Sequence, residues 1–273
     1  MTFLRKLREI QQRNNSLLCI GLDTDIHKLP EFMFEYGDPV FEYNRRIINA
    51  TKDLVCAYKI NMAFYEVRGE SGWYTVHQTL ARIPETIVRI ADPKRTDIGN
   101  SAEQYAHLFM TDYEFDAVTL PPYMGWDSIG PFVKRPSQCG FILTLTSNPG
   151  SRDFQYLKVG SRPLYEKVIE KVKTWNKKKN LGLIVGATHP RELRRIRNLA
   201  PDLPILIPGI GAQKGDLRSA VRYGVSKRGD LAIINVSRDI LYAGVDEKFP
   251  QAAREKALQY RAEINKYRKD FPA

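Results

Sequence analysis

The chain has 273 residues, of which 43% are hydrophobic and 27% are charged, so a sizeable globular core can form. Its three cysteines, Cys19, Cys56 and Cys139, have no paired spacing, which argues against a disulfide framework or a zinc site and for a reducing compartment. No apolar run approaches the length of a membrane span, so we expect a cytoplasmic protein that makes no membrane contact.

The charge balance favours basic residues, with 42 lysines and arginines against 31 aspartates and glutamates. An excess of this kind suits partners that carry phosphate, either nucleotides or nucleic acid. Many of the charges lie in helical stretches such as EKVIEKVKTWNKKKN, where a solvated surface explains them. No basic arm or known nucleic-acid-binding module accompanies them, so we expect no nucleic-acid partner.

The N-terminal stretch MTFLRKLREIQQRNN alternates charged residues with Phe3, Leu4, Leu7 and Ile10. This pattern predicts an amphipathic helix rather than a signal peptide, which would need an uninterrupted apolar run.

Eight short apolar runs follow along the chain, each rich in Val, Ile and Leu and continuous rather than alternating. Such runs are expected for parallel strands that are covered on both faces. The runs are SLLCIGL (16–22), LVCAYKI (54–60), TIVRIA (86–91), DAVTL (116–120), GFILTLT (140–146), LGLIVGAT (181–188), PILIPGI (204–210) and LAIINVS (231–237).

Amphipathic segments lie between these runs. Val40, Tyr43 and Ile47 fall at helical spacing after the first run, and Ala257 and Ile264 do so, with Tyr260 and Tyr267, after the eighth. Eight strand-plus-helix units in about 250 residues predict an α/β fold of the (β/α)8 barrel type, as a single domain over residues 1–273. A doubly wound open sheet is the alternative, and the count of eight and the lack of GxGxxG after the first run disfavour it.

Polar residues follow several of the runs, at the end of a barrel where active sites lie. Taken singly, an aspartate there is usually a helix cap, a lysine usually points to solvent and a glycine usually makes a turn. Barrel closure would nevertheless bring all of these positions to one mouth. The candidates are Asp23 after the first run, Lys59 in the second, Asp92, Lys94 and Asp97 after the third, Ser147 after the fifth, Gly209, Gly211 and Gln213 in and after the seventh, and Arg238 after the eighth.

The last two of these loops suit a phosphate group, which barrels commonly bind after their seventh and eighth strands. The backbone amides of Gly209 and Gly211 can approach an anion closely, and Gln213 adds an amide donor. Arg238 adds a guanidinium suited to a bidentate grip on phosphate. The pattern therefore predicts a barrel enzyme with a phosphate-bearing substrate and a network of Lys and Asp side chains, with no metal site.

The segment DPKRTDIG, residues 92–99, resembles the Asp-x-Lys-x-x-Asp signature of the orotidine 5′-phosphate decarboxylase family, in its bacterial subfamily with Lys-Arg inside the signature. The similarity extends through LCIGLD, AYKINMAFYE, TSNPG, VGATHP and PGIGAQ to the arginine of NVSRD. The signature alone is shared with sister decarboxylases and aldolases of sugar phosphates, and the combination of loops is much more specific.

The resemblance implies conversion of orotidine 5′-phosphate to UMP and CO2 in de novo pyrimidine biosynthesis, with no cofactor. It implies that Lys94 protonates C6 of the pyrimidine and that Asp92 lies near the departing carboxylate. The other implied roles are contacts to the ribose from Lys59 and Asp23, a homodimer in which Asp97 enters the neighbouring subunit's site with Ile98 beside it, a contact of Ser147 with the pyrimidine, and a phosphate grip by Gln213 and Arg238. The loops near 147–150 and 211–215 are candidate lids.

Two alternatives stay open at this point. A sister enzyme could use the same signature with Mg2+ on a sugar phosphate, as a decarboxylase or an aldolase. It would want a further carboxylate near the second strand, where this chain has Lys59, although Glu66 is close. The other alternative is a non-catalytic barrel that binds nucleic acid.

Overall fold

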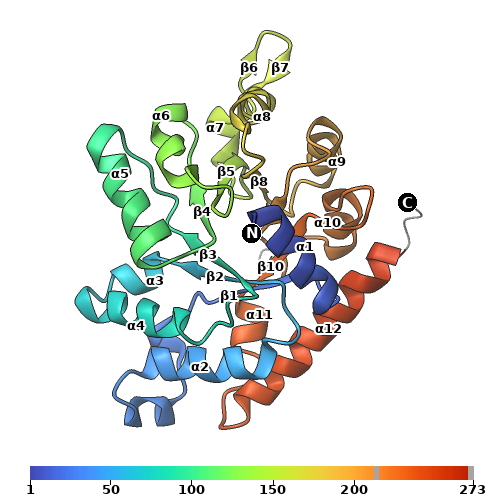
Figure 1. Ribbon diagram of the computed structural model, residues 1–273. Coiled ribbons are helices and arrows are strands. Elements are labelled where there is room, and N and C mark those ends of the chain that lie inside the picture. The colour runs from blue at the N-terminus through green and yellow to red at the C-terminus, as the bar shows by residue number, and fades with distance from the viewer. Residues whose placement is uncertain (212–214, 270–273) are drawn as a thin grey trace.

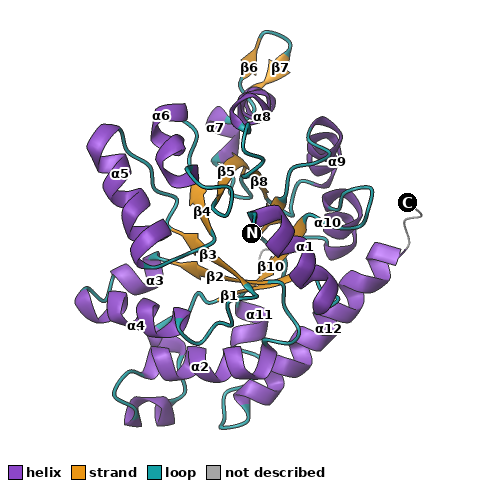
Figure 2. Ribbon diagram, viewed as in Figure 1, coloured by secondary structure: helices purple, strands orange, loops and turns teal. Residues whose placement is uncertain are grey.

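The computed structural model describes residues 1–211 and 215–269 and shows a closed barrel of eight parallel strands surrounded by helices (Figures 1 and 2). Each of the eight predicted runs contains one of these strands, to within one residue at the end of a strand, so the (β/α)8 prediction is confirmed. The strands are β1 (Leu18–Gly21), β2 (Ala57–Asn61), β3 (Val88–Asp92), β4 (Ala117–Leu120), β5 (Cys139–Leu145), β8 (Leu181–Val185), β9 (Ile205–Ile207) and β10 (Ala232–Val236). Their order around the barrel is β1-β10-β9-β8-β5-β4-β3-β2.

The helices form a ring outside the strands, as Figure 2 shows. The predicted helical spacing after the first run is confirmed, because Val40, Tyr43 and Ile47 are all buried. Asp38 starts that helix by accepting hydrogen bonds from the backbone N–H groups of its first turn. The helices of the ring are α2 (Pro39–Thr51), α3 (Ala63–Glu66), α4 (Glu70–Leu80), α5 (Gly99–His107), α6 (Trp126–Ile129), α7 (Ser151–Phe154), α8 (Leu164–Trp175), α9 (Pro190–Leu199), α10 (Leu217–Gly224), α11 (Arg238–Leu241) and α12 (Phe249–Lys269).

The predicted amphipathic helix at the N-terminus is confirmed as α1 (Phe3–Arg13), which covers the end of the barrel where the strands begin. Phe3, Leu7 and Ile10 are buried under it. Its polar residues bond to the segments that lead into the strands: Lys6 Nζ lies 2.6 Å from Asp116 Oδ1, and Gln11 Nε2 donates to the Ala232 carbonyl at 2.8 Å. The opposite end of the barrel therefore stays open for a site.

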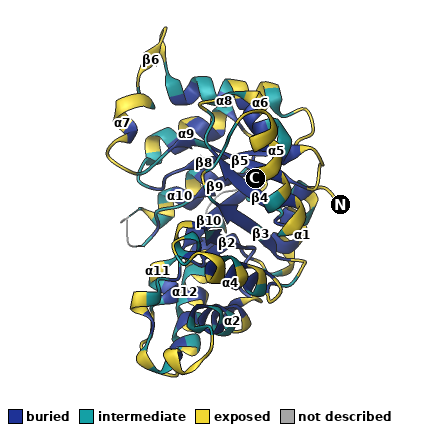
Figure 3. Cartoon of the chain, turned by 90° about the vertical axis from the view of Figure 1, so that its left-hand side faces the viewer, coloured by how far each residue is buried: buried dark blue, intermediate teal, exposed yellow. Residues whose placement is uncertain are grey.

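Burial follows the arrangement expected for a parallel barrel, with buried strands inside and the exposed residues on the outer helices and loops (Figure 3). Every residue of β1, β4, β8, β9 and β10 is buried. This double-sided covering explains why the runs are continuous in apolar residues rather than alternating. Within residues 1–211 and 215–269, no helix is long and apolar enough to cross a membrane.

One element was not predicted from the sequence. β6 (Lys158–Val159) and β7 (Arg162–Pro163) pair as an antiparallel hairpin that projects from the barrel in Figure 1. Each strand has two residues, which is too short for any periodicity to reveal, and Gly160 makes the turn with a φ of 66°. The single domain over residues 1–273 stays a prediction.

Candidate active site

A cavity of about 480 Å3 lies at the carboxyl ends of the barrel strands. Its lining includes six of the nine residues whose side chains were singled out from the sequence as catalytic or substrate-binding. These six are Asp23, Lys59, Asp92, Lys94, Ser147 and Arg238.

The charged residues form a chain of direct contacts inside this cavity. The Lys59 ammonium lies between two carboxylates, with Nζ 3.2 Å from Asp23 Oδ1 and 2.8 Å from Asp92 Oδ2. The other oxygen of Asp92 lies 2.6 Å from Lys94 Nζ. Because neighbouring parallel strands place Lys59 beside Gly21 and Asp92 beside Asn61, three strand ends deliver these charges to one point. The sequence prediction that barrel closure gathers them is confirmed.

Burial and charge act in opposite directions on the two inner members of this chain. Only 4% of the Lys59 side chain and 7% of the Asp92 side chain are exposed. Burial alone would lower the pKa of Lys59, but the charges of Asp23 and Asp92 outweigh burial and raise that pKa above its usual range. Burial likewise acts to raise the pKa of Asp92, and Lys59 and Lys94 outweigh it and hold that pKa well below its usual range. Both groups are therefore charged at neutral pH.

Lys94 differs from its neighbours in exposure and in backbone geometry. Its side chain is 49% exposed and lines the cavity, while its ammonium contacts Asp92. Its φ of 49° lies in the left-handed region, which is sparsely populated by residues other than glycine and costs roughly 1–3 kcal/mol. Such a conformation persists only where surrounding contacts hold it.

Thr119, on β4, makes one such contact and was missed in the sequence analysis. Its buried hydroxyl donates to Asp92 Oδ1 at 2.8 Å and accepts the backbone N–H of Lys94 at 3.1 Å. One side chain thus fixes both the carboxylate and the loop that carries the ammonium. A polar residue inside the apolar run DAVTL was the signal that could have found it.

The rest of the DPKRTDIG loop turns away from the cavity of its own chain. Arg95 pairs with Glu66 at 2.7 Å, and its guanidinium lies 5.2 Å from the centre of the Tyr105 ring. Asp97 accepts the backbone N–H of Ile98 at 2.7 Å, and Ile98 is 59% exposed. Neither Asp97 nor Ile98 lines the cavity.

Backbone and side chains after β9 and β10 form the side of the cavity that was predicted to hold phosphate. Gly209 and Arg238 both line it. Gly209 and Gly211 have φ values of 100° and 81°, and a Cβ on Gly211 would lie 2.5 Å from a carboxylate oxygen of Asp239. Glycine is therefore required at Gly211 on two grounds. Gln213, the remaining predicted phosphate contact, lies outside the described residues.

The cavity also contains polar residues that the strand-end argument did not single out. Gln155 fixes Thr146 with two hydrogen bonds of 2.8 Å. Its Oε1 accepts the Thr146 backbone N–H, and its Nε2 donates to the Thr146 hydroxyl. The Thr146 hydroxyl in turn lies 2.6 Å from Asn148 Oδ1. The further polar lining residues are Asn61, Asn235 and Ser237.

The donor set of this site does not resemble a metal centre. Among the residues that the structure describes, no group of three or more His, Cys, Asp or Glu side chains could hold a metal ion. Asp23 and Asp92 are the carboxylates that could have faced a cation together, and the Lys59 ammonium lies between them. The charge that a divalent ion would supply there is supplied by a side chain.

Comparison with known proteins gives a consistent result over nearly the whole chain. The model of the orotidine 5′-phosphate decarboxylase / HUMPS family matches residues 16–254. The orotidine 5′-phosphate decarboxylase of Dehalococcoides mccartyi is 48% identical over 275 aligned positions, which cover 99% of this chain and 100% of that protein. The orotidine 5′-phosphate decarboxylase of Herpetosiphon aurantiacus is 46% identical, over 94% of this chain and 96% of that protein.

Comparison with solved structures also finds orotidine 5′-phosphate decarboxylases. The OMP decarboxylase of Leishmania donovani superposes with a TM-score of 0.87 at 38% identity, covering 98% of this chain and all of that chain. The UMP synthase of the same organism gives a TM-score of 0.89 at 39% identity, and there this chain spans 57% of the longer protein.

Proposed function

The chain belongs to the orotidine 5′-phosphate decarboxylase / HUMPS family, and we propose that within this family it is the carboxy-lyase that converts orotidine 5′-phosphate to UMP and CO2. The observation that carries this assignment is the contact chain Asp23–Lys59–Asp92–Lys94 inside the cavity. Full-length similarity to proteins named as orotidine 5′-phosphate decarboxylases supports it. A sister enzyme that acts on a sugar phosphate through Mg2+ is disfavoured, because Lys59 lies where the metal's further carboxylate would be wanted.

The chemistry requires a cation beside the reacting carbon. When the bond between C6 and the carboxylate breaks, CO2 leaves and the electron pair stays on an sp2 carbon, where no ring position can delocalise it as an enolate would. The Lys94 ammonium stabilises that charge and then donates its proton to C6, which gives UMP. Lys94 suits this role because its side chain faces the open cavity, whereas Lys59 is buried between two carboxylates.

The neighbouring charges hold the proton donor in place. Asp92 contacts Lys94 at 2.6 Å, so it fixes the position of Nζ. Asp92 then also lies beside the departing carboxylate. Asp23 and Lys59, farther along the same chain of contacts, are placed to bond the ribose hydroxyls.

The far side of the cavity receives the phosphate and the base. Arg238 supplies the guanidinium, the Gly209 region supplies close backbone approach, and Gln213 is proposed as a further donor. Ser147 contacts the pyrimidine from the loop after β5. The phosphate is remote from C6, so its binding energy can order the loops and the charge chain rather than act on the reacting bond.

The active unit is proposed to be a homodimer in which Asp97 enters the partner's site. Asp97 does not line the cavity of its own chain, and the adjacent Ile98 is 59% exposed. Large apolar side chains of the next strand's loop are exposed as well, with Tyr123 at 94%, Met124 at 41% and Trp126 at 42%. Exposed apolar residues around a site's open end are what a protein partner would cover.

The test is the loss of orotidylate absorbance during turnover, measured in wild type and in Lys94→Ala. We expect turnover in wild type, also after treatment with EDTA, and none in Lys94→Ala, which should still bind UMP. Lys158→Ala, which removes an exposed lysine from the β6–β7 hairpin, is the matched control and should keep full activity. Turnover near wild type in Lys94→Ala would remove the proton-donor assignment. Activity that EDTA abolishes and Mg2+ restores would favour the sister enzyme.

A further inference from the structure

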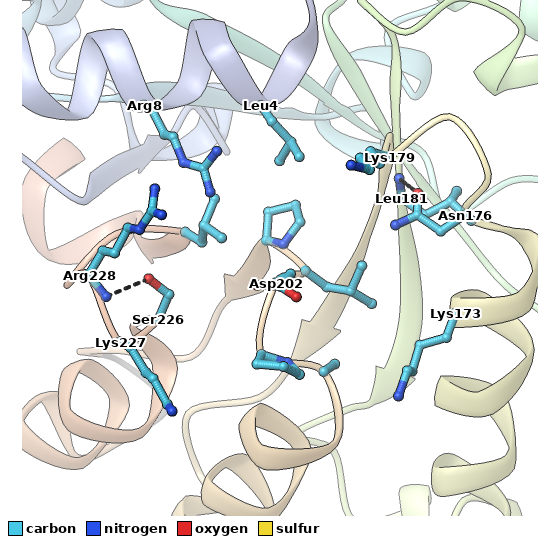
Figure 4. A pocket seen from close by; sticks show the side chains of 15 residues that line it. Leu4, Arg8, Lys173, Asn176, Lys179, Leu181, Asp202, Ser226, Lys227 and Arg228 are labelled. Atoms are coloured by element: carbon cyan, nitrogen blue, oxygen red, sulfur yellow. Dashed lines mark hydrogen bonds between the residues drawn. The ribbon is translucent and has the colours of Figure 1, made fainter. Parts of the chain in front are cut away.

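A second concave surface lies at the opposite end of the barrel, where the strands begin. A hollow of about 650 Å3 is bordered by α1 and by the segments that lead into β8, β9 and β10 (Figure 4). Its floor includes Leu4 and Leu181, and basic side chains stand around it from four different parts of the chain. These are Arg8, Lys173, Lys179, Lys227 and Arg228.

This hollow continues into two others. The next, of about 920 Å3, shares Lys227 and Arg228 with the first and adds Arg222, Arg268 and Lys269. The third, of about 220 Å3, shares Arg222 and adds Arg194. We call the lining of these three hollows the basic face. Among the residues that the structure describes, ten basic residues line it against one acidic residue, Asp202, whereas the full sequence has 42 basic and 31 acidic residues.

Helix ends explain part of this charge. The carboxyl ends of α8, α9 and α10 point toward this end of the barrel, and cations are stabilising near unpaired carbonyls. Lys173 donates to the Leu199 carbonyl at 3.0 Å, and the buried Arg197 donates to the carbonyls of Gly224, Ala200, Pro201 and Leu203. Burial lowers the pKa of Arg197 to about 10, so it still carries its charge at neutral pH.

Helix ends do not explain the loop residues Lys179, Lys227 and Arg228. They lie in the connections before β8 and β10, outside any helix. Within the described part of the chain, no carboxylate forms an ion pair with them. All three therefore line the hollow without a direct ion pair, and Lys227 and Arg228 also line the second hollow.

The basic face also offers a planar group. The Tyr223 ring in the third hollow has the guanidinium of Arg194 at 5.9 Å and that of Arg222 at 5.7 Å from its centre. An aromatic ring with flanking guanidinium groups can stack on nucleobases while the arginines meet phosphates. None of the exposed large apolar side chains among the described residues lines these hollows, which disfavours a lipid surface as the occupant.

We propose that the basic face binds single-stranded nucleic acid through its phosphates, without sequence preference and independently of the decarboxylation site. A single strand suits the geometry because the hollows follow one another and share their cations. A mononucleotide would occupy one hollow and leave the other cations unused. This proposal departs from the expectation of no nucleic-acid partner, which rested on the lack of a basic arm or known binding module in the sequence; a count of charges along a chain does not show whether they gather on one face.

The test is fluorescence anisotropy with a labelled single-stranded RNA of about 20 nucleotides, titrated at several salt concentrations. The variant is Lys227→Glu/Arg228→Glu, at two exposed loop positions. The matched control is Lys158→Glu/Lys248→Glu, which changes the net charge equally at exposed positions away from the basic face. We expect the variant to lose at least about tenfold in affinity near 50 mM salt and to lower the salt slope by about 1.4, as for two lost phosphate contacts. The control should change the affinity by less than about twofold, and both should keep the kcat/KM of wild type for decarboxylation.

Three results would overturn the proposal. The first is no binding of RNA by wild type at low salt. The second is an equal loss in the variant and the control, because binding would then reflect net charge alone. The third is displacement of the labelled RNA by polyglutamate as effectively as by unlabelled RNA of equal charge, which would make an acidic protein segment the better occupant.

Discussion

Replacing Thr119 by valine should impair catalysis without opening a cavity, because valine has nearly the shape of threonine. The change removes the hydroxyl that donates to Asp92 Oδ1 at 2.8 Å and that accepts the Lys94 N–H at 3.1 Å. A hydrogen bond to a charged group contributes about 1.5–3 kcal/mol. If all of that is lost at the transition state, kcat falls by roughly 10- to 150-fold. The loop that carries Lys94 in its left-handed conformation would also lose an anchor.

The assay is steady-state turnover of orotidine 5′-phosphate by wild type, Thr119→Val, Thr119→Ser and a control. The control is Thr144→Val, which removes a buried hydroxyl on the neighbouring strand, bonded to the Ile142 carbonyl at 3.0 Å. Thr144 does not line the cavity, whereas the adjacent Leu143 does.

Thr119→Val should lose kcat with little change in KM, because the substrate contacts remain. Thr119→Ser should recover most of the activity, and Thr144→Val should keep it. A kcat for Thr119→Val within about twofold of wild type, less than 0.5 kcal/mol, would refute the idea that this hydroxyl positions the proton donor.

Three further predictions concern the same site. Arg238→Ala should cost about 2–5 kcal/mol of transition-state stabilisation. With a substrate that lacks the phosphate, added free phosphite should then raise the turnover of wild type much more than that of the variant. An equal increase in both would contradict a contact between Arg238 and the phosphate. Mixing Lys94→Ala with Asp97→Asn under conditions of subunit exchange should restore about a quarter of the sites, because one site of each mixed dimer is intact; no recovery despite exchange would exclude a shared site. The shifted pKa values of Asp92 and Lys59 predict a contribution to the free energy of unfolding that is fully present between about pH 5 and 9. Because the pKa of Asp92 is lowered, its part is lost on acidification below about pH 4. Because the pKa of Lys59 is raised, its part is lost on alkalinisation above about pH 10. Urea unfolding of Asp92→Asn against wild type measures the acid loss, and a difference that stays constant down to pH 3 would contradict it.

The sequence was sufficient for the barrel because each strand is buried on both faces and therefore appears as an uninterrupted apolar run. It was sufficient for the charge chain because closure of a barrel places all strand ends together, so Asp23, Lys59, Asp92 and Lys94 could be grouped without knowing any distance. Which lysine contacts which carboxylate could not be predicted from the sequence. Nothing in the order of residues says that Lys59, rather than Lys94, is the ammonium held between two carboxylates.

Two other features were missed for different physical reasons. Thr119 acts through a hydroxyl in the interior of a strand, where a search of strand ends does not look. The basic face gathers residues from α1, α8, α9, α10 and α12 and from the loops before β8 and β10, and such a gathering depends on the tertiary fold rather than on any local pattern. Basic residues that are far apart in the sequence can therefore lie close together on one surface of the folded protein.

The position of α1 has a consequence for how the protein forms on the ribosome. Gln11 bonds to the carbonyl of Ala232, and Arg8 lies 2.9 Å from a carboxylate oxygen of Asp230, so two contacts of the first helix are made to residues synthesised more than 200 positions later. At a translation rate of about 5–20 residues per second, α1 lacks these two contacts for on the order of 10–45 s. During that interval the helix is only partly held by the rest of the nascent chain, and chaperones could bind it. Synthesis of β10 allows both the barrel and the helix contacts to be completed, because that strand pairs with β1 and supplies the carbonyl that accepts the Gln11 hydrogen bond.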